Sequence, residues 1–430
     1  MTKLRVQVLV YVNINRLAYD LTIVGGGIIG CATAREMKCR HPELQIAIVE
    51  KEDGIAKHQT SHNSGVIFTG LFYKSDCVKA KMCSDSMKQV YEYLCKNDIP
   101  HKKSGKLVVA QTEDDICELN ELYESGLENK CPDIQLVERE CIANFEPKCK
   151  GKKALWCPWT GNVDWSTVCH RFARDFKEMG GVIHENFKVA GFAEAIESKG
   201  TRELHPLCVH SKNQYMHTKY VLTCAGLFSD QLARMSDCPP YPKVVPMRSE
   251  YLKLRESRQC LVQTNLYSLS KTTKYPFWSL HFNQGVNGEV ILGPNAVFAM
   301  SREGYAWRDV DLQHCSSLAA CPGYHRFWTK NFVVGVNQFA RSLVPRLSVN
   351  EAKRYIPPLT PDDVARGPTG VSAIAVDRDG YAIDDFVFDN GPGRIGQRIL
   401  HLRNVPSPGA SGCMTIAKFL ADKMEKEFKF

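Results

Sequence analysis

The sequence predicts an α/β fold in which a discontinuous nucleotide-binding domain carries an inserted α+β domain built on an antiparallel sheet. Three observations support this prediction. A short strand, a glycine-rich turn and a helix follow one another from residue 20 onward. Apolar runs typical of buried parallel strands recur near both ends of the chain, whereas residues 244–293 are rich in strand formers and turns. At 430 residues, the chain is long enough for two or three domains.

The first unit of the chain reads as strand, turn, helix and second strand. Residues 21–24 are a β-branched run, and residues 25–30 read Gly-Gly-Gly-Ile-Ile-Gly. Residues 31–40 are helical in pattern, and residues 45–49 form another apolar run. This order predicts a βαβ unit whose turn contains the G-x-G-x-x-G pattern of dinucleotide-binding proteins.

Each glycine of this pattern has an expected steric role. Gly25 permits the tight turn, Gly27 lets the backbone approach a pyrophosphate, and Gly30 lets the helix pack closely on the strand. Glu50 ends the second strand about 20 residues later, where a carboxylate accepts hydrogen bonds from ribose hydroxyls and repels a 2′-phosphate. A glycine-rich turn alone is weak evidence, so the prediction depends on the whole order of elements.

The elements that follow predict the rest of the architecture. Helices are expected over residues 78–97, 112–127, 167–179 and 413–425, and strands over residues 106–110, 182–183, 187–189, 220–226 and 399–404. The nucleotide-binding domain is expected to comprise residues 19–95, 151–240 and 366–430. The inserted domain is expected to comprise residues 96–150 and 241–365, and residues 1–18 form an N-terminal extension.

Charge and hydropathy exclude several classes of protein. The net charge is +8, but the basic clusters contain no interleaved aromatic residues and no zinc-finger pattern, so no nucleic-acid partner is expected. No run of about 18 apolar residues occurs, so no transmembrane segment is expected, although peripheral membrane contact stays open. The 18 cysteines are scattered without a C-x-x-C pair, which favours reduced thiols in an intracellular protein and no metal site.

The N-terminal residues carry a targeting signal that has two interpretations. Residues 1–19 contain Lys3, Arg5 and Arg16 and, before Asp20, no acidic residue, which is the charge pattern of a mitochondrial presequence. Residues 6–12 are rich in β-branched side chains, however, which suits a plain extension better than an amphipathic helix. We expect a mitochondrial location, with a cytoplasmic one as the alternative.

With these residues located, the chain resembles the FAD-dependent D-amino-acid-oxidase-like superfamily and, within it, the L-2-hydroxyglutarate dehydrogenase family. The matching stretches are residues 23–30, 50–52, 58–67, 105–107, 223–227, 292–297, 302–305, 366–368, 377–380, 385–388 and 403–408. The resemblance implies a Rossmann-like FAD-binding domain, an inserted substrate domain and FAD as the cofactor. It also implies a 2-hydroxy acid substrate and an electron acceptor other than oxygen, which the sequence does not identify.

The resemblance implies a set of cofactor contacts. A polar loop after the second strand is expected to lie against the flavin, and the turn before the last helix is expected to lie near the flavin pyrimidine. The implied cofactor-binding residues are Gly25, Gly27, Gly30, Glu50, Lys51, Thr60, Ser61, Asn63, Ser64, Gly65, Val189, Ala225, Gly226, Pro408 and Gly409. Taken by itself, the polar loop is better explained by residues that cap its own backbone, and the family resemblance reverses this preference.

The resemblance also implies roles in catalysis. The family oxidises L-2-hydroxyglutarate to 2-oxoglutarate, which requires a base for the hydroxyl proton and cations for two carboxylates. His281 is the candidate base, Arg248, Arg302 and Arg403 are candidate carboxylate partners, and Tyr251 is a candidate hydroxyl donor. The alternative for the histidine is a packing role, and for each arginine it is an ordinary ion pair.

The chain departs from the family pattern at several positions. Phe68 and Ser372 stand where the family has His and Arg, residues 249–250 replace Gly-Asp, and Ser279 replaces Gly. Three functions therefore stay open for what looks like a diverged member: L-2-hydroxyglutarate oxidation, oxidation of another 2-hydroxy or 2-amino acid, and flavin binding with weak catalysis.

Overall fold

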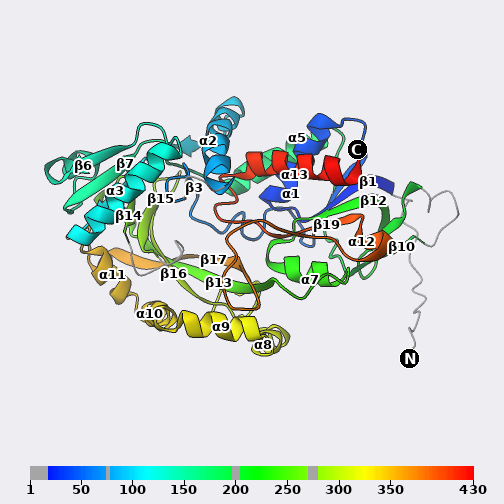
Figure 1. The fold of residues 1–430 in the computed structure, drawn as a ribbon. Coiled ribbons are helices and arrows are strands. Elements are labelled where there is room, and N and C mark those ends of the chain that lie inside the picture. Colours follow the sequence, from blue (N-terminus) through cyan, green and yellow to red (C-terminus); the bar gives the residue numbers. More distant parts are fainter. Residues whose placement is uncertain (1–17, 74–77, 196–203, 270–278) are drawn as a thin grey trace.

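In the computed structural model, residues 18–73, 78–195, 204–269 and 279–430 are described. Two eight-stranded sheets dominate these residues, and a small three-stranded sheet accompanies them (Figure 1). The small sheet has the order β3-β8-β4 and consists of β3 (Val66–Ile67), β8 (Gly161–Val163) and β4 (His101–Lys102).

The first sheet contains the glycine-rich turn. Its strands run in the order β10-β11-β12-β1-β2-β9, with β19 paired to β12 and β18 paired to β19. Their bounds are β1 (Ala18–Val24), β2 (Ile46–Val49), β9 (Val182–His184), β10 (Gly191–Glu194), β11 (Leu207–His210), β12 (Tyr215–Thr223), β18 (Val387–Asp389) and β19 (Ile399–Asn404). The pairs β1–β2, β1–β12, β2–β9 and β12–β19 are parallel, which brings both ends of the chain into one sheet.

Helices cover both faces of this sheet (Figure 1). The helices around it are α1 (Ile28–Arg40), α2 (Val78–Lys96), α5 (Trp165–Glu178), α7 (Ser229–Arg234), α12 (Gly393–Gly396) and α13 (Cys413–Phe428). Ile23 and Ile48 are buried in a core with α1, α5 and α13, while Val49 is buried on the other face with Leu232 of α7. Burial on both faces explains why these strands are almost continuously apolar.

The second sheet has the order β17-β13-β16-β15-β14-β5-β7-β6. Its strands are β5 (Lys106–Ala110), β6 (Gln135–Glu138), β7 (Lys153–Cys157), β13 (Lys243–Leu254), β14 (Asn265–Ser268), β15 (His281–Gln284), β16 (Val290–Phe298) and β17 (Val364–Val376). Among its described strands, β5 and β14 are parallel and every other neighbouring pair is antiparallel.

Helices also pack on the second sheet. On one face, Leu119 of α3 is buried with Leu155 of β7; on the other, Val349 of α11 is buried with Leu266 of β14. The helices of this domain are α3 (Glu113–Glu128), α4 (Ile142–Phe145), α8 (Leu312–Ala319), α9 (Pro322–Lys330), α10 (Phe332–Leu343) and α11 (Arg346–Ala352). Figure 1 shows α8 to α11 as an arc along the lower edge of the molecule. No described helix combines the length and the apolar character that a bilayer crossing requires.

The structure differs from the sequence-based expectations in three places. Residues 187–189 form no strand; instead, the Phe187 N–H donates to the carbonyl of Glu50 at 2.7 Å. The expected domain boundaries at 151 and 366 place β7 and β17 with the first sheet, but both strands pair in the second. Of the expected N-terminal extension, residues 1–17 lie outside the described residues, and Ala18 begins β1.

Candidate functional site

Two glycines of the first turn are required by the packing of the protein itself. Gly25 follows β1 with φ +117°, and a Cβ there would lie 2.4 Å from the carbonyl oxygen of Cys224. A Cβ on Gly30 would lie 2.0 Å from the carbonyl oxygen of Gly25. Real Cβ atoms do not approach backbone so closely, so these positions fix the contact of α1 with its neighbouring strands.

Gly27 differs from the other two glycines, because the protein leaves room for a side chain there. Its backbone is extended, with φ −78° and ψ 174°, and a Cβ would meet only the Thr60 Oγ1, at 3.4 Å. The same Thr60 oxygen accepts the N–H of Ile28 at 3.0 Å, at the start of α1. A space beside the N-terminus of a helix, which only a glycine leaves open, fits a pyrophosphate.

Glu50 lies beside this turn, as expected for a residue that binds ribose. Its Oε2 accepts the N–H of Gly26 at 2.7 Å, and its Oε1 accepts the N–H of Glu52 at 3.0 Å. A carboxylate offers about four acceptor positions, so this buried group can still accept from ribose hydroxyls. Val189 is buried in the same core as Val49, close to this end of the sheet.

The polar loop of residues 58–65 is held mainly by its own hydrogen bonds. Ser61 Oγ donates to the carbonyl of His58 at 3.1 Å, and Asn63 donates to the carbonyl of Thr60 at 2.8 Å. Asn63 also accepts the N–H of Gly65, whose φ is +70°. Ser61 and Asn63 are exposed and Ser64 is half-buried, so they remain accessible to a cofactor.

A second close approach of backbone to this loop occurs after β12. Ala225 precedes a short 3₁₀ helix (Gly226–Phe228), and a Cβ on Gly226, whose φ is +49°, would lie 2.9 Å from Gln59 Nε2. The structure thus brings the expected residues Ala225 and Gly226 to the loop of residues 58–65.

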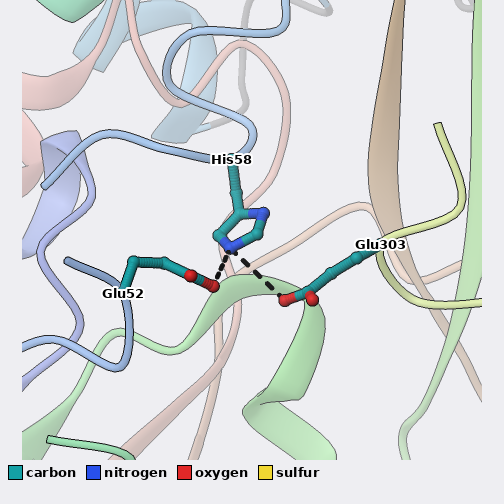
Figure 2. A group of neighbouring side chains, drawn as sticks. All are labelled: Glu52, His58 and Glu303. Atoms are coloured by element: carbon teal, nitrogen blue, oxygen red, sulfur yellow. Dashed lines mark hydrogen bonds and ion pairs between the residues drawn. The ribbon is translucent and has the colours of Figure 1, made fainter. Parts of the chain in front are cut away.

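Lys51 lies in a cluster of charges rather than at the glycine turn. Glu52 and Glu303 approach His58 Nε2 from opposite sides, at 2.9 and 3.3 Å (Figure 2). These three side chains have the composition of a metal site. The Lys51 ammonium, however, pairs with both carboxylates and lies 2.9 Å from His58 Nε2, and hydrogen bonding to it lowers the pKa of Glu52. A lysine therefore already supplies the positive charge that a metal ion would bring.

The turn before α13 lies against the small sheet. Ser411 Oγ accepts the N–H of Phe68 at 3.0 Å and donates to the carbonyl of Val66 at 3.1 Å. The Gly412 N–H donates to the carbonyl of Pro408, and α13 begins one residue later. Pro408 and Gly409 are thus placed at a helix N-terminus, where the resemblance expects the flavin pyrimidine.

A row of residues that are buried, apart from the half-buried Tyr251, crosses five neighbouring strands of the second sheet. From β13 to β5 it consists of Tyr251, Gly293, His281, Tyr267 and Lys106, which we call the cross-strand row. Lys106 lies opposite Asn265 in the register, two residues from Tyr267. His281 lies opposite both Gly293 and Tyr267 in the register. A Cβ on Gly293 would lie 2.7 Å from Tyr251 Cδ1, so the absence of a side chain there lets Tyr251 lie over the strand.

His281 is held as a neutral imidazole of defined tautomer. Its Nδ1 lies 2.9 Å from the carbonyl oxygen of Ser279, which can only accept, so Nδ1 carries the proton and Nε2 keeps its lone pair. Nε2 makes no hydrogen bond to any of the described residues. Burial, and then the charge of Lys106, lower the pKa of His281 to about 3. The Tyr267 ring stacks on the imidazole with centroids 4.2 Å apart.

Lys106 is the functional candidate that the sequence did not single out. It is 1% exposed, and its ammonium lies 4.6 Å, 4.8 Å and 4.3 Å from the ring centroids of Phe68, Phe72 and Tyr267. Within the described part of the chain, no carboxylate pairs with it. Burial lowers its pKa to about 8. The available signal was a lysine that opens the otherwise apolar run of residues 106–110, inside one of the stretches that resemble the family.

Two of the candidate arginines, Arg302 and Arg403, are already engaged in ion pairs within the protein. Arg302 makes a buried bidentate pair with Asp230, at 2.7 and 3.0 Å. Arg403 pairs with Asp389 at 2.6 Å and donates to three backbone carbonyls, those of Pro239, Tyr241 and Pro242. Both terminal nitrogens of each guanidinium already donate hydrogen bonds, so neither arginine has a free pair of terminal N–H groups for bidentate binding of a substrate carboxylate.

Arg248 and Tyr251 lie on β13. The Arg248 guanidinium donates twice to Glu250, at 3.0 and 2.8 Å, and lies 4.3 Å from the ring centroid of Trp307, so its charge is already paired. Tyr251 belongs to the cross-strand row, and burial raises the pKa of its phenol, which stays protonated and can donate a hydrogen bond.

Ser372 lies on β17, two residues after Gly370, where a Cβ would lie 2.3 Å from the carbonyl oxygen of His62. On β17, Val371 packs in a cluster with Leu227, whereas Ile374 and Val376 pack in a cluster with residues of α8 and α9. Because side chains alternate along a strand, Ser372 shares the face of Ile374. Among the departures from the family pattern, Phe68 contacts the cross-strand row through its ring and Ser279 through its backbone carbonyl.

The glycine turn and the row of buried polar side chains on a second sheet together define a flavin-dependent oxidoreductase. The chain belongs to the FAD dependent oxidoreductase family, DAO, whose model matches residues 20–423. Its cofactor is FAD, and the fold class predicted from the sequence is confirmed. An L-α-glycerophosphate oxidase from Mycoplasma pneumoniae with FAD bound is similar, with a TM-score of 0.72, 19% identity and coverage of 93% of each chain. A glycine oxidase from Geobacillus kaustophilus has a TM-score of 0.68, 17% identity and coverage of 95% of each chain.

Curated relatives place the chain more closely within this family. An L-2-hydroxyglutarate dehydrogenase, mitochondrial, from Nematostella vectensis is 43% identical over 95% of this chain and 91% of the relative. The protein of the same name from Homo sapiens is 41% identical over 96% of this chain and 90% of the relative. The chain is an enzyme of the L-2-hydroxyglutarate dehydrogenase-like type, which confirms the resemblance derived from the sequence.

Proposed function

We propose that the chain oxidises L-2-hydroxyglutarate to 2-oxoglutarate with reduction of FAD. Relatives of that name, at 41–43% identity over nearly the whole chain, support the substrate. The observation that carries the proposal is His281, a buried neutral imidazole whose Nε2 lone pair meets no described partner, on the same sheet as a buried ammonium.

Residues of the first sheet would hold the cofactor. Gly27 and the N-terminus of α1 suit the pyrophosphate, Glu50 suits the ribose, and the turn containing Ser411 suits the flavin end. The chemistry that FAD supplies when bound is acceptance of a hydride from the C2–H bond of the substrate.

His281 would accept the proton of the substrate hydroxyl at Nε2. Its Nδ1–H bond to the Ser279 carbonyl fixes the ring, so the lone pair keeps one direction. A pKa of about 3 keeps the imidazole neutral at physiological pH and ready to accept. The entry of an anionic substrate favours the imidazolium and raises this pKa during the reaction. The protonated phenol of Tyr251 would donate to a substrate oxygen.

The test is an anaerobic titration of the purified flavoprotein with L-2-hydroxyglutarate. We expect the visible flavin absorbance to bleach and 2-oxoglutarate to form in equal amount, and we expect D-2-hydroxyglutarate to leave the spectrum unchanged. His281→Asn, at equal flavin content, should bleach much more slowly. A spectrum that stays oxidised with the L-enantiomer would overturn the proposed function.

Phe68 favours a second candidate function, the oxidation of another 2-hydroxy or 2-amino acid. Its phenyl ring lies 4.6 Å from the Lys106 ammonium, at a position where the family resemblance expects histidine. An apolar ring there changes the substrate contacts on this side of the site. The same titration with a panel of 2-hydroxy and 2-amino acids distinguishes the two candidates, because only the true substrate bleaches the flavin rapidly.

We also propose that the protein is located in mitochondria and passes electrons to an acceptor other than oxygen. The location is supported by the basic, acid-free stretch of residues 1–19 and by the mitochondrial designation of the relatives, and the acceptor by their name of dehydrogenase. A fluorescent reporter fused behind residues 1–19 should co-localise with a mitochondrial dye. Diffuse fluorescence would contradict this location.

A further inference from the structure

The Lys106 ammonium is an unusual group for a protein interior. It is almost fully buried at the first position of β5, and three aromatic rings surround it at 4.3 to 4.8 Å. A buried charge is ordinarily paired with an opposite charge, because desolvation is costly. Among the described residues, no carboxylate meets this requirement for Lys106.

The aromatic rings explain how the protein keeps this ammonium without a partner of opposite charge. The faces of Phe68, Phe72 and Tyr267 attract a cation and cannot neutralise it. They therefore position the charge and leave its requirement for an anion unmet. Phe68 also connects the Lys106 ammonium to the turn before α13. Its backbone N–H donates to Ser411 Oγ, while its ring contacts the ammonium.

Lys106 and the candidate base lie in one row. Tyr267, on the strand between them, stacks on His281 and also contacts the Lys106 ammonium. Arg302 and Arg403, two of the other candidate cations, differ from Lys106 because their charges are already paired with Asp230 and Asp389.

We propose that Lys106 is the anion-binding residue of the substrate site, with its ammonium pairing with a carboxylate of the substrate. This inference rests on the proposed function for the identity of the substrate, and it assigns the positive charge that recognises it. The aromatic rings preorganise the ammonium, and the substrate carboxylate supplies the missing opposite charge.

The pairing depends on the protonation of Lys106. Burial lowers its pKa to about 8, while the Cys157 and Cys131 thiols, Tyr267 and His281 are the other titratable groups near it. Burial also raises the pKa of Tyr267 and of Cys131, and His281 is neutral above pH 4, so none of these three changes charge between pH 6.5 and 9. Anion affinity should therefore fall as the pH rises through about 8.

The experiment measures glutarate binding to the FAD-loaded protein by isothermal titration calorimetry, because glutarate is a dicarboxylate that carries no hydroxyl to oxidise. Lys106→Met should raise the Kd for glutarate about ten- to a hundredfold at pH 7. Lys103→Met is the matched control, because the Lys103 ammonium also lies over two rings, those of Tyr91 and Trp159, but is exposed. It should bind glutarate as the native protein does.

Butanoate, a monocarboxylate, reports which carboxylate Lys106 binds. A loss confined to glutarate places Lys106 at the distal carboxylate, and a loss for both ligands places it at the carboxylate beside the hydroxyl; either supports the proposal. An unchanged Kd for both ligands in Lys106→Met would overturn it. If that variant does not fold, the native protein still decides, since a glutarate affinity that is constant from pH 6.5 to 9 contradicts the proposal.

Different results would refute the proposed reaction and the proposed role of Lys106. Lys106-dependent glutarate binding without flavin bleaching by L-2-hydroxyglutarate would refute the proposed reaction alone. Rapid bleaching together with a Lys106→Met variant that binds glutarate normally would refute the role of Lys106 alone.

Discussion

Replacing Lys106 by Met should make the substrate-free protein more stable. Methionine has a similar length and no charge, and its thioether packs well against aromatic rings. The native lysine is instead held charged at 1% exposure among Phe68, Phe72 and Tyr267. The substitution therefore removes the cost of burying a charge while keeping most of the packing.

The lowered pKa gives the size of this effect. The pKa of Lys106 falls from the ordinary 10.5 to about 8, and at 1.36 kcal/mol per pH unit this corresponds to about 3 kcal/mol. Cation–π attraction to the rings offsets about 2 kcal/mol of that cost. The net gain expected for Lys106→Met at pH 7 is about 1–3 kcal/mol in the free energy of unfolding.

The difference in the free energy of unfolding between the native protein and Lys106→Met should depend on pH. Below pH 8, the lysine is charged in the folded and the unfolded chain, so the cost of burial is fully present. Between pH 8 and 10.5, the unfolded chain binds the proton that the folded chain has released, so native stability rises with pH. Above this range, the difference between the native protein and Lys106→Met should disappear.

Urea unfolding of both proteins at pH 7 and pH 10, at matched flavin content, measures this difference. Lys103→Met, on the exposed lysine, is the control and should change the free energy of unfolding by less than about 0.5 kcal/mol. A Lys106→Met protein that is less stable than the native one at pH 7 would mean that the ammonium has a stabilising partner, and the account of an unpaired buried charge would be wrong.

Three further substitutions test other parts of the structure. Gly27→Val should yield protein without flavin, because its branched side chain enters the pyrophosphate path, whereas the control Gly54→Val should stay yellow. Flavin absorbance after purification measures both variants, and a yellow Gly27→Val protein would refute the role of the turn. His281→Asn should lower kcat about 10²- to 10⁴-fold at unchanged flavin content, and a steady-state rate within tenfold of the native one would exclude it as the base. Asp230→Ala should lower the free energy of unfolding by about 3–5 kcal/mol in urea, because Arg302 is left buried and unpaired; a loss below 1 kcal/mol would contradict the structural role of the pair.

The nucleotide-binding unit could be predicted from the sequence because its requirements are local. Gly25 and Gly30 lie within a short stretch, and their roles follow from the contact of one strand with the next helix. The strand of residues 106–110 was also predicted within its observed bounds, because its apolar run is continuous. Residues 312–352 were assigned no elements in advance, yet they form α8 to α11, short helices whose burial depends on the sheet beneath them.

The substrate side of the site could be predicted only in part. His281 and Tyr251, named as candidates from the family resemblance, lie near each other in the cross-strand row. The ion pairs of Arg302 and Arg403 could not be predicted, because their partners Asp230 and Asp389 lie elsewhere in the sequence. Lys106 was missed for a related reason. A lysine at the start of a strand is usually exposed, and only the tertiary structure encloses this one in aromatic rings.

The parallel pairing of β5 with β14 has a consequence for the order of synthesis. Asn265 donates to the carbonyl of Gly105 at 2.9 Å, and the two residues are 160 positions apart in the sequence. A growing chain therefore carries Lys106 at an unpaired strand edge until residues 265–268 leave the ribosome. During that interval the lysine is in water and keeps its full charge without cost, which also discourages edge-to-edge association with other nascent chains.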